Sequence, residues 1–269
     1  LPNPHYWGAA DVILDQVVYY PLEDRSASLK QFRSGDLHWT YEVPGSQFQW
    51  LRDHYPEELQ ISPWLGSYFF GFNLEREPFI DSPGLRRALV LAIDRELLTG
   101  KVTRFGEMPT WALVPPGIGD YTSPQPEWAE WTQADREAEA RRLYAAAGFS
   151  ADRPLRIQIR YNTSENHKKV ALAIASMWKQ VLGVQAELVN EEWKVFLQNR
   201  SQRQLTQVFR AGWIGDYADP NSFLEMFRSG HGQNDYGYSN RLYDSLLEQA
   251  AAEGVPARRR RLLQEAERL

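Results

Sequence analysis

The sequence predicts an α/β fold in which at least some of the strands are parallel. Between residues 154 and 213, three strand-like segments (154–162, 184–190 and 205–213) alternate with two helix-like segments. This β-α-β-α-β order favours parallel strands joined by helical crossovers. The chain has 269 residues and is 43% hydrophobic, which suffices for one large domain or two ordinary ones.

The first sixty or so residues are predicted to be rich in β-structure. VILDQVVYY (12–20) and LHWTYEV (37–43) have the β-branched and aromatic composition of strands, and a short helix between them is expected to end at Gly35. The stretch LQISPWLGSYFFGFNL (59–74) is expected to be extended. It is typical of a strand that passes from one lobe of a protein to another.

Helix signals follow in the next part of the chain. Residues 81–83 (Asp-Ser-Pro) supply a cap and an N1 proline before an expected helix over 85–98. Thr132 and Asp135 form a near capping box ahead of a helix that Gly148 is expected to end.

Polar residues follow each of the three strands between 154 and 213. Asn162 and Asn190 end the first two strands, the segment RAGWIGDYADP (210–220) ends the third, and Ser164 is expected to cap the first crossover helix. In α/β lobes, ligands bind beyond the carboxyl ends of the strands. We therefore expect these three polar sites to meet at one edge of the sheet.

Composition excludes several classes of function. The net charge of −5 argues against nucleic acid as a partner, and the basic run 258–261 is expected to be a solvated helix face. The chain has no cysteine, which excludes disulfides, iron–sulfur clusters and thiol nucleophiles. No apolar run reaches the roughly 18 residues of a membrane span. The five histidines form no H-x-x-x-H pair, so no metal site is expected.

The two ends of the sequence suggest that it is a piece of a longer protein. It begins at Leu1 without a methionine and ends at Leu269, inside an expected amphipathic helix. The absence of a signal peptide therefore says little about targeting.

Three chemistries fit the segment 210–220. Asp216 and Asp219 could be a catalytic carboxylate pair, although Asp219 precedes Pro220 and is explained by capping of the next helix. Ser164, His167 and Asp216 could imitate a hydrolase triad, although no nucleophile elbow surrounds the serine. The third chemistry is recognition of a zwitterion, a ligand that carries a positive and a negative charge.

Recognition of such a ligand accounts for more of the segment than catalysis does. Asp216 offers a negative charge, and Arg210 and His167 offer positive charges. Gly212 and Gly215 permit a close approach of a ligand backbone to the main chain. A strand between them could then pair with an extended peptide.

Four segments resemble a known family. NPHYWGAADV, YNTSENHKKVALAIASMW, LVNEEWKVFLQNR and RAGWIGDYADPNSF are similar to the periplasmic oligopeptide-binding proteins of ABC importers (family 5 extracellular solute-binding proteins), and the last three are especially similar to the murein tripeptide-binding type. The resemblance implies a periplasmic binding protein type II-like lobe, with a mixed sheet flanked by helices. It implies that residues 1–64 are a β-rich remnant of the first lobe. Residues 65–269 would be most of the second lobe, without its C-terminal return segment.

The resemblance also assigns ligand-binding roles by position. Asp216 matches the residue that pairs with a peptide ammonium, Arg210 and His167 match residues that meet ligand carboxylates, and Gly212 and Ile214 match positions whose main chain pairs with the ligand. The positions that match side-chain pockets are Trp193, Trp213, Asn162, Arg200, Trp64 and Phe69. Simpler roles stay open: Trp193 and Trp213 could be core aromatics, Arg200 could be a solvated helix residue, and Asn162 could be a turn former.

Two departures from general oligopeptide binders bear on specificity. Those proteins carry a cysteine pair at the positions of Gly66 and Ile214, and an acidic pocket residue at the position of Gly71. Both changes match the murein tripeptide type, and they slightly favour a cell-wall peptide.

The sequence thus predicts a non-enzymatic, peptide-binding subunit of an ABC importer. It would capture an extended peptide between two lobes and deliver it to permease subunits, as an exported periplasmic monomer without cofactor, nucleic-acid partner or membrane insertion. A binder of sugar, a nickel chelate or haem on the same fold is the alternative, but a neutral sugar offers no ammonium to Asp216. A hydrolase is the least favoured class.

Overall fold

The computed structural model describes residues 3, 5–22, 24–62 and 64–269. The chain divides into two compact units, Leu1–Gln60 and Ile61–Leu269. The division falls close to the boundary after residue 64 that we expected. The assignment of the two units to two different lobes stays a prediction.

The first unit is helical where it is regular, and the prediction of a β-rich region is wrong for its described residues. The expected helix is present as α1, with Asp24 as N-cap and Gly35 at φ 84° as C-cap. The expected strands 12–20 and 37–43 do not form, and Ile13 is 92% exposed. Strands need neighbours for their backbone groups, and no described segment pairs with these two. The elements of this unit are η1 (Ala9–Asp11), α1 (Arg25–Ser34), η2 (Gly45–Gln47) and α2 (Phe48–His54).

The second unit is built on a four-stranded mixed sheet in the order β1-β4-β2-β3. β2 is parallel to β3 and to β4, whereas β1 is antiparallel to β4. The predicted α/β class and the predicted partly parallel sheet are confirmed. The strands are β1 (Gly66–Phe72), β2 (Arg156–Asn162), β3 (Gln185–Glu191) and β4 (Val208–Ile214).

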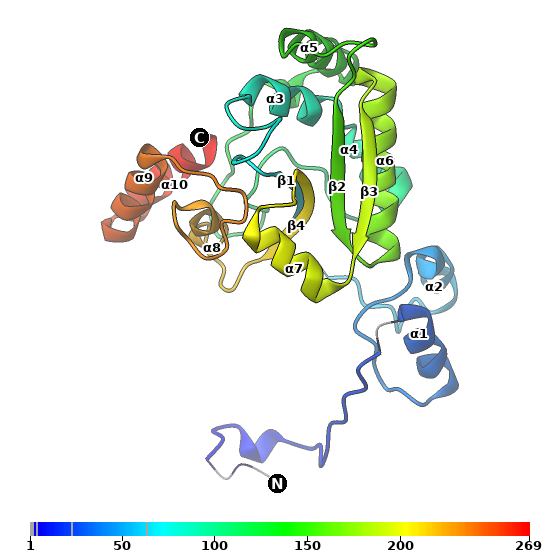
Figure 1. The fold of residues 1–269 in the computed structure, drawn as a ribbon. Helices are drawn as coiled ribbons and strands as arrows, with labels where there is room; N and C mark the ends of the chain where they lie inside the picture. The colour runs from blue at the N-terminus through cyan, green and yellow to red at the C-terminus, as the bar shows by residue number, and fades with distance from the viewer. Residues whose placement is uncertain (1–2, 4, 23, 63) are drawn as a thin grey trace. The chain divides into compact units, whose positions relative to one another are not determined.

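Helices cover both faces of this sheet. α6 (Glu165–Leu182) lies along one face of β2 and β3, and α7 (Trp193–Gln202) lies at their carboxyl ends (Figure 1). Ile157, Ile159 and Val208 share a core with α6, so we call their side the α6 face. Phe209 and Ala211 share a second core with Phe196 of α7, so we call the opposite side the α7 face.

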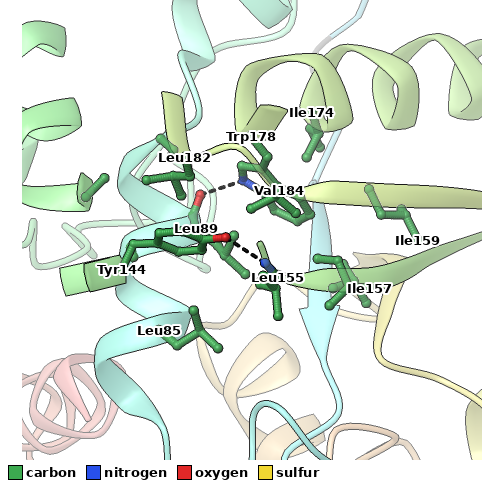
Figure 2. Close-up of a cluster of buried hydrophobic side chains, with 14 of the residues drawn as sticks. Leu85, Leu89, Tyr144, Leu155, Ile157, Ile159, Ile174, Trp178, Leu182 and Val184 are labelled. Carbon is green, nitrogen blue, oxygen red and sulfur yellow. Dashed lines mark hydrogen bonds between the residues drawn. The ribbon is translucent and has the colours of Figure 1, made fainter. Parts of the chain in front are cut away.

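The largest core lies between α6, the sheet and two further helices. Two buried polar groups are satisfied within it: the Trp178 indole N–H donates to the Leu89 carbonyl at 2.8 Å, and the Leu155 N–H donates to the Tyr144 hydroxyl oxygen at 2.8 Å (Figure 2). Satisfied polar groups let these aromatic side chains bury their rings without a desolvation penalty. The further helices are α3 (Pro83–Leu91) and α5 (Gln133–Ala146).

Helix boundaries follow the caps, with two exceptions. The helix expected over 85–98 is interrupted, because Asp94 accepts from the Leu97 N–H and starts α4 (Arg95–Leu97), which η3 (Leu98–Thr103) continues. Ser82 and Ser164 occupy N-cap positions, but neither side chain makes a capping hydrogen bond, so the expected capping by Ser164 is wrong. Thr132 caps α5 as predicted, by accepting from the Asp135 N–H. η4 (Glu127–Glu130) precedes it.

The C-terminal helices form a hydrophobic cluster of their own. Pro220, not Asp219, is the N-cap of the helix that follows, although Asp219 accepts from the Asn221 N–H at 2.8 Å; Asp219 also binds Arg259 with both oxygens at 2.7 and 2.8 Å. Glu267 accepts from the N–H of Val114 at 2.9 Å and from the Tyr121 hydroxyl at 2.7 Å. The elements are α8 (Asn221–Leu224), η5 (Glu225–Phe227), α9 (Arg241–Ala252) and α10 (Pro256–Arg268).

Candidate functional site: an open strand edge

The carboxyl-terminal half of β4 presents unpaired backbone groups on one edge. Beyond the two ends of its ladder with β1, the Gly215 N–H donates to Leu65 at 2.8 Å, and the Asn73 N–H donates to Gln207 at 2.9 Å. Hydrogen-bonded pairs alternate along an antiparallel ladder, so the odd-numbered residues of β4 bond to β1. The N–H and C=O groups of Gly212 and Ile214 therefore point to the opposite edge.

β2 lies on that opposite edge, but it pairs with β4 over a short distance. The last matched residues are Arg160 and Phe209, and beyond them the two strands are not paired with each other. Figure 1 shows β4 and β2 apart at this end of the sheet, where α7 lies. The edge of β4 at Gly212 and Ile214 is thus free of any strand among the described residues. An extended backbone can bind such an edge by main-chain hydrogen bonds.

Arg210, Tyr68 and His167 gather on the α6 face beside this edge. The Arg210 guanidinium lies 5.2 Å from the centre of the Tyr68 ring, and the Tyr68 hydroxyl lies 3.2 Å from Nδ1 of His167. His167 is in the first turn of α6, where the helix dipole adds positive potential. The cluster is suited to an anionic group.

The electrostatics of this cluster are those of a cation without a counter-ion. Burial lowers the pKa of Arg210, and no carboxylate forms an ion pair with it in the part of the chain that the structure describes. Its buried Nε also has no hydrogen-bond partner among these residues. Desolvation raises the pKa of Tyr68 to about 12, although Arg210 opposes the shift, so the phenol is protonated at neutral pH. A ligand carboxylate would supply the missing partner.

Asp216 follows β4 directly and has an exposed side chain. Its N–H donates to the Ser222 hydroxyl oxygen at 3.0 Å, which fixes the backbone where the strand ends. Gly215, the residue before it, has no room for a side chain, because a Cβ there would lie 2.9 Å from the Phe223 ring. The carboxylate is therefore held beyond the open edge and is available to a cation.

The other predicted pocket residues do not form one group. Phe69 and Trp213 are partly buried against the α7-face core, which supports a packing role. Arg200 is bound to Asp235 with 2.5 Å between Nε and Oδ2, and its side chain is only 14% exposed, so it is not the solvated helix residue considered above. Trp193, at the start of α7, is 46% exposed and stacks on Phe196, and Trp64 is 58% exposed.

Asn162 lies at the end of β2, directly opposite Glu191 of β3. Its Oδ1 is buried and has no donor among the described residues, and the same is true of Oε2 of Glu191. The other oxygen of Glu191 accepts from Asn199 at 2.8 Å and is ion-paired with Arg160. Asn162 is thus more than a turn former, since it brings an unused acceptor to the carboxyl end of the sheet.

Catalytic arrangements are not assembled here. Nδ1 of His167 meets Tyr68, and the Ser164 hydroxyl is buried without a hydrogen-bond partner among the described residues, so no Ser–His contact is formed. Asp219 is bound by Arg259 and does not form an acid–base pair with Asp216. No group of three metal-ligating side chains occurs among the residues that could be searched.

Sequence reasoning missed Tyr68, Arg160 and Glu191. Tyr68 stands in an apolar strand, where alternation alone gives it no function. Arg160 is nearly buried, and its position in a strand gave no indication of an ion pair with a residue 31 positions away. The parallel register of β2 and β3 would have been needed to find that pair.

The two departures from general oligopeptide binders, at Gly66 with Ile214 and at Gly71, can be located in the structure. Gly66 and Ile214 are direct partners in the β1–β4 ladder, so the two changes occur at neighbouring positions. At Gly71, a Cβ would lie 2.3 Å from the Tyr236 ring. The space beside Gly71 is therefore occupied by an aromatic ring.

Comparison with known proteins identifies the family. The family model described as "Bacterial extracellular solute-binding proteins, family 5 Middle" matches residues 1–235. The chain belongs to this family. The predicted resemblance to family 5 solute-binding proteins is thereby confirmed.

Two curated relatives have peptide-related names. The periplasmic oligopeptide-binding protein OppA of Salmonella typhimurium is 40% identical over 246 residues, which cover 91% of this chain and 45% of that protein. The periplasmic murein peptide-binding protein MppA of Escherichia coli is 38% identical over 255 residues, covering 95% of this chain and 47% of that protein. The chain thus spans about half the length of these relatives.

Solved structures agree with the described fold. The Escherichia coli murein tripeptide binding protein MppA matches with a TM-score of 0.92 and 37% identity, covering 98% of this chain and 52% of that one. Haemophilus influenzae OppA in complex with the peptide RPPGFSPFR matches with a TM-score of 0.89 and 33% identity, covering 98% and 52%. The structure has no helix long and apolar enough to cross a membrane among its described residues.

Proposed function

We propose that this chain is the peptide-binding part of a solute-binding subunit of an ABC importer. The observation that carries the proposal is the open edge of β4, at Gly212 and Ile214, between an unpaired cation and an exposed carboxylate. An extended peptide offers a backbone to such an edge and opposite charges at its two ends. The names of the relatives, OppA and MppA, support a peptide as the solute.

Each charged group has a distinct role in this proposal. Asp216 pairs with the α-ammonium of the peptide, and Arg210 and His167 receive a ligand carboxylate. Trp64, Trp193 and Asn162 line side-chain pockets at the carboxyl ends of the strands. Arg200, bound to Asp235, positions the floor of these pockets, as Phe69 and Trp213 do by packing.

The importer role extends to the whole protein. Binding would close two lobes around the peptide, and the closed form would be recognised by the permease subunits. The periplasm is the proposed location, since the names of relatives from Salmonella typhimurium and Escherichia coli place those proteins there. We propose a monomer without catalytic activity, because the arrangement of Asp216, Asp219, Ser164 and His167 provides no nucleophile with a base.

The experiment that tests this proposal removes the carboxylate beyond β4. In a protein of the relatives' length that contains this chain, Asp216→Ala is expected to weaken peptide binding about 30-fold, the effect of removing one partner from a desolvated charge pair. Isothermal titration calorimetry against short peptides provides the measurement. Asp152→Ala, at an exposed aspartate before β2, is the matched control and should bind as the parent does. Equal affinities of the Asp216 variant and the parent would refute the assignment, and hydrolysis of the peptides would refute the non-enzymatic role.

A further inference from the structure

Two buried acceptor oxygens face the carboxyl ends of β2 and β3 without donors. Asn162 and Glu191 are opposite residues of a parallel pair, so their side chains leave the sheet on the same side. Oδ1 of Asn162 and Oε2 of Glu191 are each buried and lack a hydrogen-bond partner among the described residues. A buried acceptor without a donor costs roughly 1–3 kcal/mol, so a donor from outside the chain is favoured here.

Glu191 is held firmly in this position. Its side chain is only 9% exposed, and its Oε1 is engaged by Arg160 and by Asn199, the latter at 2.8 Å. Arg160 is itself fixed by Oε1 of Gln158 at 2.9 Å and by the Leu205 carbonyl at 3.3 Å. The Glu191 carboxylate cannot turn Oε2 toward Arg160 without losing the contacts that Oε1 makes with Arg160 and Asn199. Asn162 as a whole is half-buried, so its amide can be approached from outside the chain.

We propose that Asn162 and Glu191 form a subsite for an uncharged primary carboxamide, such as the side chain of glutamine or asparagine. This inference rests on the proposed peptide-binding function and names the kind of ligand side chain that it selects. A primary carboxamide has two N–H donors on one nitrogen, and the subsite has two acceptors.

Charge excludes an ammonium and a carboxylate as the ligand group of this subsite. Arg160 already neutralises Glu191, so an added ammonium would meet a cation without a free counter-ion. A ligand carboxylate would face two acceptor oxygens and would be repelled. A thioether such as methionine fits by size, but it leaves both oxygens without donors. Of these four groups, the neutral amide is the one that satisfies both oxygens without adding a charge beside the Arg160–Glu191 ion pair.

The strand geometry restricts selection by this subsite to alternate residues of the peptide ligand. Side chains of a peptide on the β4 edge point alternately to the α6 face and to the α7 face. The subsite lies on the α7 face, because Arg160 and Phe209 are opposite residues and Phe209 belongs to the core of α7. A glutamine at one peptide position should therefore be selected, and a glutamine at the next position should not.

A probe experiment on the 269-residue chain tests the subsite without a peptide. The chain, labelled with ¹⁵N, is titrated by NMR with acetamide, sodium acetate or methylammonium chloride at equal ionic strength. We expect acetamide to shift the Asn162 and Glu191 signals saturably, with at least fivefold higher affinity than either ion. Equal or weaker binding of acetamide would overturn the inference.

Asn162→Leu is the variant that separates a ligand subsite from a structural role. Removing an unpaired acceptor should leave the melting temperature unchanged or raise it, while the affinity for acetamide falls at least fivefold. A fall of several degrees in the melting temperature would show that the amide is already used inside the protein, and the subsite would be refuted. Asn166→Leu, in the first turn of α6, is the control for a leucine near the sheet end.

Peptides distinguish failure of this inference from failure of the proposed function. In a protein of the relatives' length, tetra-alanine peptides carry glutamine, methionine, lysine or glutamate at one position at a time. We expect glutamine to bind about fivefold to tenfold better than methionine at one position, and equally at its neighbours. Equal binding at every position refutes the carboxamide subsite and leaves the peptide function intact. Absence of binding by all peptides refutes the peptide function, and acetamide still decides the subsite.

Discussion

Replacement of Arg210 by methionine should stabilise the protein while it removes the cation of the binding site. The guanidinium is held 5.2 Å from the Tyr68 ring without an ion pair among the described residues, and burial lowers its pKa. Methionine keeps most of the apolar stem. The lost cation–π contact is worth about 1 kcal/mol, whereas the relieved desolvation of an uncompensated cation is about 2 kcal/mol. The expected net gain is therefore about 1 kcal/mol.

The matched control is the same substitution at Arg200. This arginine is ion-paired to Asp235, with side-chain exposures of 14% and 7%. Arg200→Met would leave the Asp235 carboxylate buried and uncompensated, so a loss of about 3–5 kcal/mol is expected. Two identical substitutions in neighbouring parts of the site should thus change stability in opposite directions.

Differential scanning calorimetry of the unit that contains the sheet measures both effects. A gain of 1 kcal/mol corresponds to a rise in melting temperature of about 2–4 °C for a unit of this size. In peptide titrations, Arg210→Met should weaken the binding of peptides with a free carboxylate more than that of their amidated forms. A lower melting temperature for Arg210→Met would show that Arg210 stabilises the fold. The idea of a cation held for a ligand would then be refuted.

Three further substitutions probe the packing and the pH dependence. Desolvation raises the pKa of Glu267 above its ordinary value of 4.5, so the contribution of Glu267 to the free energy of unfolding declines as pH rises above that value. The Glu267→Gln substitution should flatten this decline, measured by urea unfolding between about pH 4 and 8. Gly71→Ala should cost about 1–3 kcal/mol in the same assay, because the new Cβ would lie 2.3 Å from the Tyr236 ring, and an unchanged midpoint would contradict that packing. Burial raises the pKa of Asp219, but the hydrogen bonds from Arg259 and the backbone outweigh it and lower the pKa below its ordinary value of 3.8. Its contribution to stability should be lost as pH falls below that value, so Asp219→Asn should cost about 1 kcal/mol at pH 7 and progressively less below pH 3.8.

The second unit could be predicted from the sequence because its local and long-range preferences agree. Between β2 and β4, each change from strand to helix is marked by alternation, by a polar residue or by a glycine. Gly183 at φ 76°, for example, ends α6 where the sequence placed the end of a helix. Parallel crossovers then fixed the common edge at which Asn162 and the start of the segment 210–220 lie.

The first unit could not be predicted in the same way. Residues 12–20 have strong β-propensity, but propensity describes how a side chain fits a sheet and does not supply the neighbouring strand. For the site, charge and glycine content identified Arg210, Gly212 and Asp216. Tyr68 and Glu191 depend on the register of β1 and β3 against their neighbours, which the sequence does not display.

The open edge of β4 separates holding a ligand from choosing it. The main-chain groups of Gly212 and Ile214 are the same whatever side chains the protein carries, so they can hold any extended backbone. The side chains that line the two faces, such as His167 on one and Glu191 on the other, can change without disturbing those groups. A protein built in this way can acquire a new preference through one or two substitutions on a face, while its hold on the backbone of the ligand persists.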